Sequence, residues 1–216
     1  MSSSATTEVD IANMALTMLG QQPITDLDDD NNRANLVDKR LADVRDTVLR
    51  SHHWNSCIKR ASLTKDSTAP VWGYANRYPV PTDFIRLVDT EDDTTEYRIE
   101  AGNQGETAAS YILSDDTEMN ILYVANITTV SQMDSTLKHA FAIRLAAEIA
   151  VAVTGDAAQE AAMMQKYEIV LMEARFEDSS SHNSLETIRG GEWLSSRLGG
   201  GVYRDFPALD GGGDAV

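Results

Sequence analysis

The sequence has little cysteine and no long apolar run. Its 216 residues contain one cysteine, Cys57, which excludes a disulfide framework within the chain. The longest apolar stretch, residues 140–153, is interrupted by Arg144 and Glu148 and is shorter than the roughly 20 residues that a membrane-spanning helix needs. The first residues, MSSSATTEVD, show neither the basic start nor the apolar core of a signal peptide. We therefore expect a protein made in the cytoplasm without a membrane anchor.

Positive charge is also scarce. Lysine and arginine total 18 against 34 aspartates and glutamates, so the formal net charge is −16 at pH 7. A chain of this charge repels phosphate, which argues against nucleic-acid binding through basic contacts. The remaining composition, 42% hydrophobic and 24% charged, is typical of a globular protein with a sizeable core.

Helical periodicity marks both ends of the folded region. We predict a helix over residues 7–19, capped by Thr7 and ended by Gly20. A second helix begins near residues 30–31, and we expect its apolar seam to pack against other helices. That seam consists of Ala34, Val37, Leu41, Val44 and Val48.

Two further helices are predicted over residues 132–153 and 156–178, as an antiparallel hairpin that turns at Gly155. The first of them is apolar on most of its circumference. This is typical of a helix that is central in a bundle or is packed by neighbouring subunits.

Between the two helical regions, over residues 55–130, the pattern alternates and turn residues separate short segments rich in β-branched and aromatic residues. We predict an inserted antiparallel sheet of four or five strands, from SCIKRASL, DFIRLVDT, TEYRIEA, ASYILS and EMNILYVANI. The predicted fold class is therefore α+β: about four helices in an antiparallel bundle, an inserted β subdomain and an extended C-terminal arm. The expected boundaries are 1–54, 55–130, 131–178 and 179–216.

The arm, residues 179–216, is rich in serine and glycine and cannot build a core by itself. It nevertheless contains large apolar side chains that are costly to leave in water. This combination is typical of a segment that becomes ordered when it binds a partner. The candidate interface residues are Trp193, Leu194, Arg197, Leu198, Tyr203 and Phe206.

Motifs for catalysis or metal binding find little support. The stretch RSHHWNSC, residues 50–57, contains two histidines and Cys57, but it lacks a fourth ligand at the spacing of structural zinc sites. We therefore predict that this stretch is the joint between a helix and the sheet, with Trp54 as a core anchor. The acidic run from Asp26 fails as a calcium loop because Asn31 and Val37 stand where Gly and Glu are required. We predict no metal, no cofactor and no catalytic residue.

The methionines of the last helix, Met163, Met164 and Met172, are open to two interpretations. They can form an adaptable docking surface or pack in the core. We favour the core, which is the commoner role on a helix.

The order of these features resembles the tail tubular protein A and head-to-tail adaptor family of short-tailed bacteriophages. The resemblance rests on NMALTMLG, RDTVLRSHHWN, YPVPTDFIRL and GGEWLSSR, and it spans roughly residues 8–200. It implies a structural virion protein of the phage tail that forms a ring, twelve-fold in the family, beneath the portal protein. It also implies that the helices and the arm (about residues 183–206, with Trp193 and Leu194 as anchors) dock on the portal, while the β-rich part faces the tail nozzle or fibres.

Three functions remain open from the sequence. The first is the adaptor ring, which forms part of the DNA channel for genome retention and ejection. The second is a tail-associated glycan or peptidoglycan hydrolase, because some relatives are credited with that activity. The third is a generic acidic interaction domain of cellular origin. The adaptor is the favoured prediction, and it is not an enzyme.

Overall fold

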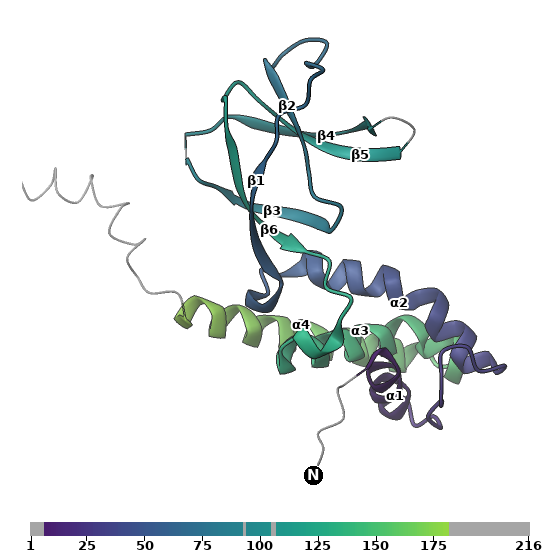
Figure 1. The fold of residues 1–216 in the computed structure, drawn as a ribbon. Coiled ribbons are helices and arrows are strands. Elements are labelled where there is room, and N and C mark those ends of the chain that lie inside the picture. Colours follow the sequence, from purple (N-terminus) through teal and green to yellow (C-terminus); the bar gives the residue numbers. More distant parts are fainter. Residues whose placement is uncertain (1–6, 93, 105–106, 182–216) are drawn as a thin grey trace, which may run out of the picture. The chain divides into compact units, whose positions relative to one another are not determined.

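The structure, a computed structural model, describes residues 7–92, 94–104 and 107–181. The described chain is an α+β protein of four α-helices and two three-stranded antiparallel sheets, as predicted at the level of fold class (Figure 1). Compactness divides the chain into residues 1–177 and 178–216.

Helix α1 (Glu8–Met18) has the predicted ends. Thr7 caps it with a capping box, in which the Thr7 hydroxyl accepts from the Asp10 backbone N–H while the Asp10 carboxylate accepts from the Thr7 N–H at 2.7 Å. Gly20 follows the helix at φ 69°, a left-handed conformation that favours glycine.

Helix α2 (Asn32–Ser51) is capped by Asn31, whose side chain accepts from the Ala34 N–H at 2.9 Å. All five residues of the predicted apolar seam are buried. Their spacing of three and four residues forms one narrow stripe, so the periodicity alone located this part of the core.

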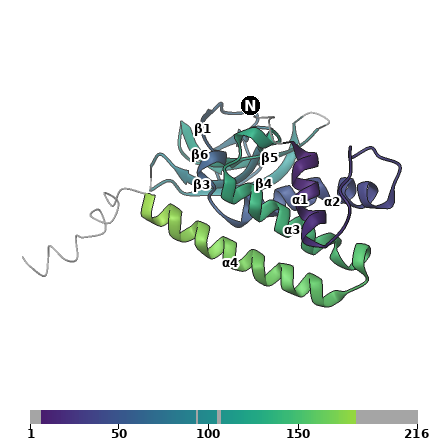
Figure 2. The same ribbon diagram turned by 90° about the horizontal axis from the view of Figure 1, so that it is seen from below.

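Helices α3 (Ser135–Thr154) and α4 (Ala157–Ser181) follow the sheets and are joined at Gly155, which has φ 73° (Figure 2). Helix α3 begins three residues later than predicted because Asp134 caps it, its carboxylate accepting from the Leu137 N–H at 2.6 Å. The preceding residues form a short 3-10 turn, Val130–Gln132. As its apolar circumference predicts, α3 is buried along most of its length and packs against both α1 and α2.

The β-region differs from the prediction of one sheet, because its described residues form six strands in two sheets. The first sheet has the order β1 (Ile58–Leu63), β6 (Met119–Ala125), β3 (Phe84–Thr90); the second has the order β2 (Asn76–Pro79), β5 (Thr107–Ser114), β4 (Tyr97–Gln104). All pairs are antiparallel. The sequence missed β2, which is short and ends at a proline, at an edge where a missing N–H is tolerated.

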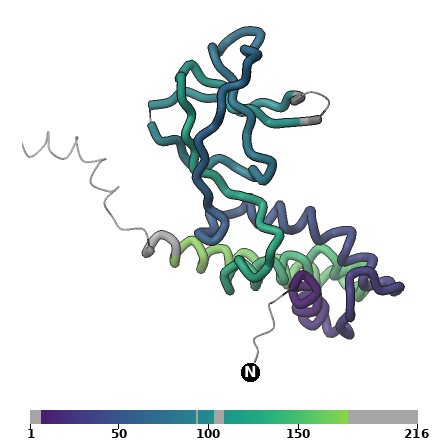
Figure 3. Tube along the Cα trace, viewed as in Figure 1, coloured from purple at the N-terminus to yellow at the C-terminus, as the bar shows by residue number. Residues whose placement is uncertain are grey.

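One apolar cluster contains residues from both helices and strands, including Val44 of α2, Tyr78 of β2, Val124 of β6 and Phe141 of α3. The chain leaves α2, runs through all six strands and returns to the helical part at α3 (Figure 3). A strand-rich insertion between consecutive helices is therefore built on the same core as those helices.

Candidate functional site

The stretch after α2 is the joint that the sequence predicts. Helix α2 ends at Ser51, a 3-10 turn follows at Asn55–Cys57, and β1 begins at the next residue. Trp54 is 2% exposed, and its indole N–H donates to the Val48 carbonyl oxygen at 2.9 Å. The His52 ring lies edge-on to the Trp54 ring, with 5.0 Å between centroids. Trp54 is a core anchor, and this prediction is confirmed.

Cys57 is buried and unsuited to nucleophilic chemistry in the folded protein. Burial raises the pKa of its thiol to about 11, although the Ser56 hydroxyl acts in the opposite direction. A reactive cysteine needs a thiolate at neutral pH, hence a lowered pKa. Within the described residues, no group of three or more histidine, cysteine, aspartate or glutamate side chains is arranged to hold a metal ion.

The acidic run before α2 forms a hydrogen-bonded turn. One carboxylate oxygen of Asp29 accepts from the backbone N–H groups of Thr25 and Asp26, at 2.8 and 3.2 Å. Asn31 caps the helix. These contacts give the run a local structural role at the start of α2.

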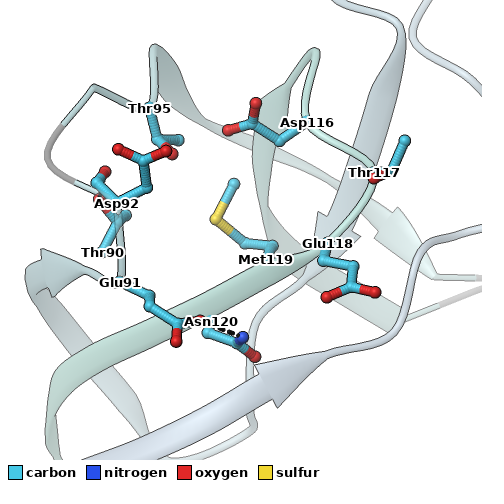
Figure 4. Close-up of a pocket in the computed structure, with 9 residues that line it drawn as sticks. All are labelled: Thr90, Glu91, Asp92, Thr95, Asp116, Thr117, Glu118, Met119 and Asn120. Carbon is cyan, nitrogen blue, oxygen red and sulfur yellow. Dashed lines mark hydrogen bonds between the residues drawn. The ribbon is translucent and has the colours of Figure 1, made fainter.

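An acidic cavity of about 270 Å³ lies between the end of β3 and the start of β6. Four of its lining residues are acidic: Glu91, Asp92, Asp116 and Glu118. Figure 4 shows their carboxylates spread around the Met119 side chain, rather than converging on one point.

Individual contacts of these carboxylates are structural. Glu91 accepts from the Asn120 side-chain amide at 2.5 Å. Asp92 accepts from the backbone N–H and the hydroxyl of Thr94, and these two bonds lower the pKa of the Asp92 carboxyl. The Asp116 carboxylate accepts from the Ser114 hydroxyl at 3.2 Å. These hydrogen bonds hold in place the turns that form part of the cavity wall.

Two carboxyl groups outside the cavity, those of Asp66 and Asp83, also have lowered pKa values. The Thr68 backbone N–H, together with Arg77, lowers the pKa of Asp66. Burial by itself would raise the pKa of Asp83, but hydrogen bonds from Lys59 and Tyr123 outweigh it and the pKa is lowered. A glycosidase general acid needs a raised pKa, so neither these two nor Asp92 suits that role.

The predicted methionine face of α4 is divided. Met163 packs against the core, and Met164 is half-buried, where its sulfur accepts from the Arg144 guanidinium at 2.8 Å. Met172, however, is 60% exposed, so its assignment to the core is wrong. Its position on the helix, opposite the buried face, explains the difference.

Helix α4 has apolar residues on two opposite sides. Its buried side carries Tyr167, Val170, Leu171 and Ala174. Its outer side carries the α4 stripe, which we define as Ile169, Met172 and Phe176, exposed by 51%, 60% and 75%. The spacing of three and four residues places these side chains in one row. The prediction from the sequence placed Met172 in the core and did not identify this second apolar face.

A second exposed apolar surface lies in the β-region. The segment between β1 and β2 carries Val71 and Trp72, which are 99% and 80% exposed. We call residues 70–74 the Trp72 loop. It borders a cavity of about 260 Å³ whose other lining residues include Arg77, Arg98 and Tyr111. Pro70 and Gly73 are residues that favour turns, and Val71 and Trp72 lie between them. Two large apolar residues inside a predicted turn are the sequence signal that could have located this exposed loop.

The predicted portal-docking residues, Trp193, Leu194, Arg197, Leu198, Tyr203 and Phe206, lie outside the described residues. Their role stays a prediction. No protein-family model matches the chain, and a search of curated proteins gives no match either. Within the described residues, no helix has the length and apolar character to span a membrane.

Proposed function

We propose that the chain is a structural virion protein, the head-to-tail adaptor that joins the portal of a short-tailed phage to its tail. The observation that carries the proposal is the α4 stripe. A helix that is apolar on two opposite sides and leaves one side exposed is typical of a protein that completes its packing by assembly. The resemblance of the sequence to the head-to-tail adaptor family suggests that this assembly is a ring beneath the portal.

In this proposal the four helices form the bundle of each adaptor subunit, and twelve subunits form the ring. The arm, residues 179–216, docks on the portal through its apolar side chains, and repetition around the ring adds avidity. The two small sheets face the nozzle or fibres. DNA passes through the channel without specific binding, which suits a chain of net charge −16, because the charge keeps the duplex from adhering.

The test is native mass spectrometry of the full chain mixed with the portal protein encoded beside it. We expect a complex with twelve copies of this chain. A version ending at Ser181, and a full-length variant carrying Trp193→Ser with Leu194→Ser, should both lose the complex. The matched control is Ser195→Ala, a small change in the same segment that should retain it.

The outcomes separate the arm from the ring. A complex that persists in both arm variants would keep the adaptor but overturn the docking role of the arm. No complex with the full chain would overturn the adaptor proposal itself.

A further inference from the structure

The exposed side of α4 forms a row whose steps alternate between four and three residues. The α4 stripe is the second half of this row, and exposed residues earlier in the helix continue it. Alternating steps of three and four residues are the pattern of the seam between two paired helices. Figure 2 shows α4 as the outermost of the four helices, on whose outer side the row lies. The row consists of Ala158, Ala162, Gln165, Ile169, Met172 and Phe176.

Four charged residues flank the row, two on each side. Lys166 and Glu173 occupy one flank, and Glu168 and Arg175 occupy the other. The two members of a flank are seven residues apart, which is about 10 Å along the helix axis and too far for an ion pair. Each flank therefore carries one positive and one negative group that cannot pair with each other within the helix.

These four charged groups are accessible to a second molecule. All four residues are exposed. Among the ion pairs of the described residues, none includes any of the four. Arg175 donates to the Ser51 carbonyl oxygen through a long hydrogen bond of 3.3 Å, and its guanidinium has further N–H groups to donate. A partner with opposite charges at matching positions can therefore pair with all four groups.

We propose that this partner is a second copy of the chain, and that two α4 helices pair antiparallel along the row to form a dimer. Ile169 of each copy lies against Met172 of the other, which covers the centre of the α4 stripe. Gln165 lies against Phe176 at both ends of this contact. Apolar side chains that are exposed in the single chain are thereby removed from water.

The charges of the two flanks match in this register. A two-fold axis brings the same flank of both helices side by side, so each residue of a flank meets a residue of that flank in the other copy. Lys166 therefore meets Glu173 of the second copy, and Glu168 meets Arg175. The axis repeats each pair, so all eight charged groups of the two helices have a partner of opposite sign.

The same charges disfavour the other ways of pairing two α4 helices. An antiparallel pair shifted by one repeat sets identical residues together, Lys166 against Lys166 or Glu173 against Glu173. A parallel pair sets Glu168 against Glu173 of the second copy. Copies of a chain with net charge −16 also repel one another as a whole, so a contact that pairs opposite charges is needed to hold them together.

A two-fold contact is complete at two copies and does not extend into a ring. The inference concerns the free chain and does not rest on the proposed function. If the chain is the adaptor, the dimer covers the α4 stripe until subunits join the ring. Contact along a few turns of one helix is small, so we expect a weak dimer that forms and separates readily.

A charge swap tests the register. Sedimentation equilibrium of the full chain should show monomer and dimer. Lys166→Glu and Glu173→Lys should each weaken the dimer about tenfold, because each change sets like charges together at two symmetric places. An equimolar mixture of these two variants should form a heterodimer about as tightly as wild type dimerises, since each chain supplies the charge that the other lacks. Glu160→Lys makes the same change of charge outside the contact and should retain the dimer.

An apolar change tests the seam itself. Met172→Asp should leave the chain monomeric, whereas Val151→Asp, at an exposed apolar position on α3, should retain the dimer. Circular dichroism checks that each variant is folded, which we expect because all the changed residues are exposed. A monomeric wild type, a dimer that survives Met172→Asp, or two charge variants that fail to associate when mixed would each overturn the proposal.

The portal complex separates this inference from the proposed function. If the free chain is monomeric but forms the twelve-copy complex with the portal, the adaptor stands and the dimer is wrong. If the dimer and its charge variants behave as expected but no portal binds, the dimer stands and the adaptor is wrong.

Discussion

Replacing Trp54 by alanine should destabilise the protein by about 3–5 kcal/mol, the range for truncating a large aromatic side chain in a core. Trp54 is 2% exposed, so nearly all of its apolar surface returns to water on unfolding. The change also removes the N–H that donates to the Val48 carbonyl at 2.9 Å and the edge-on contact with His52. Losing these contacts moves the expected value toward the upper part of the range.

The assay is urea denaturation followed by far-UV circular dichroism, which does not depend on tryptophan fluorescence. Trp54→Phe keeps most of the packing and loses the hydrogen bond, so it should cost less than Trp54→Ala. Trp72→Ala is the matched control: the same change at a side chain 80% exposed, with an expected effect within about 0.5 kcal/mol. A loss below about 0.5 kcal/mol for Trp54→Ala would place this side chain outside the core and refute the reasoning.

Three further predictions test particular contacts. Cys57 should react with a thiol reagent at pH 8 far more slowly in the native protein than in guanidinium, since burial raises its pKa to about 11; native and unfolded rates within tenfold of each other would contradict this. Gly102→Ala should cost about 1–3 kcal/mol, because a Cβ would lie 2.9 Å from Cε2 of the buried Tyr111; an unchanged urea midpoint would show that the ring moves aside freely. Asp83 has a lowered pKa, so it stabilises the fold above its unfolded pKa and loses this effect as pH falls through the folded pKa. The difference in unfolding free energy between wild type and Asp83→Asn should therefore shrink from pH 7 to pH 3, and a constant difference would count against the Lys59–Asp83 pair.

The elements that periodicity located correctly are those whose ends carry local signals. Thr7 and Asp10 form a capping box within four residues, and Gly155 ends α3 in a left-handed conformation. Such contacts depend only on near neighbours in the chain, so they can be read from the sequence. The joint at Trp54 belongs to the same group, because its hydrogen bond reaches back six residues to Val48.

The division of the strands into two sheets was not predictable in this way. β1 pairs with β6, and β2 pairs with β5, across long stretches of chain. Alternation identifies a strand but not its partner, since every pair uses the same backbone hydrogen bonds. β2 was missed because four residues ending in Pro79 give too short a pattern.

By itself, then, the sequence determined the α+β class, the helix caps, the buried seam of α2 and the acidic character of the whole chain. Each of these depends on composition or on residues within a few turns of one another. Tertiary structure alone decided which side of α4 is covered, leaving Met172 exposed, and brought Arg98 beside the Trp72 loop. A helix with two apolar sides does not specify which one packs inward; that choice is made by the shape of the core against which it folds.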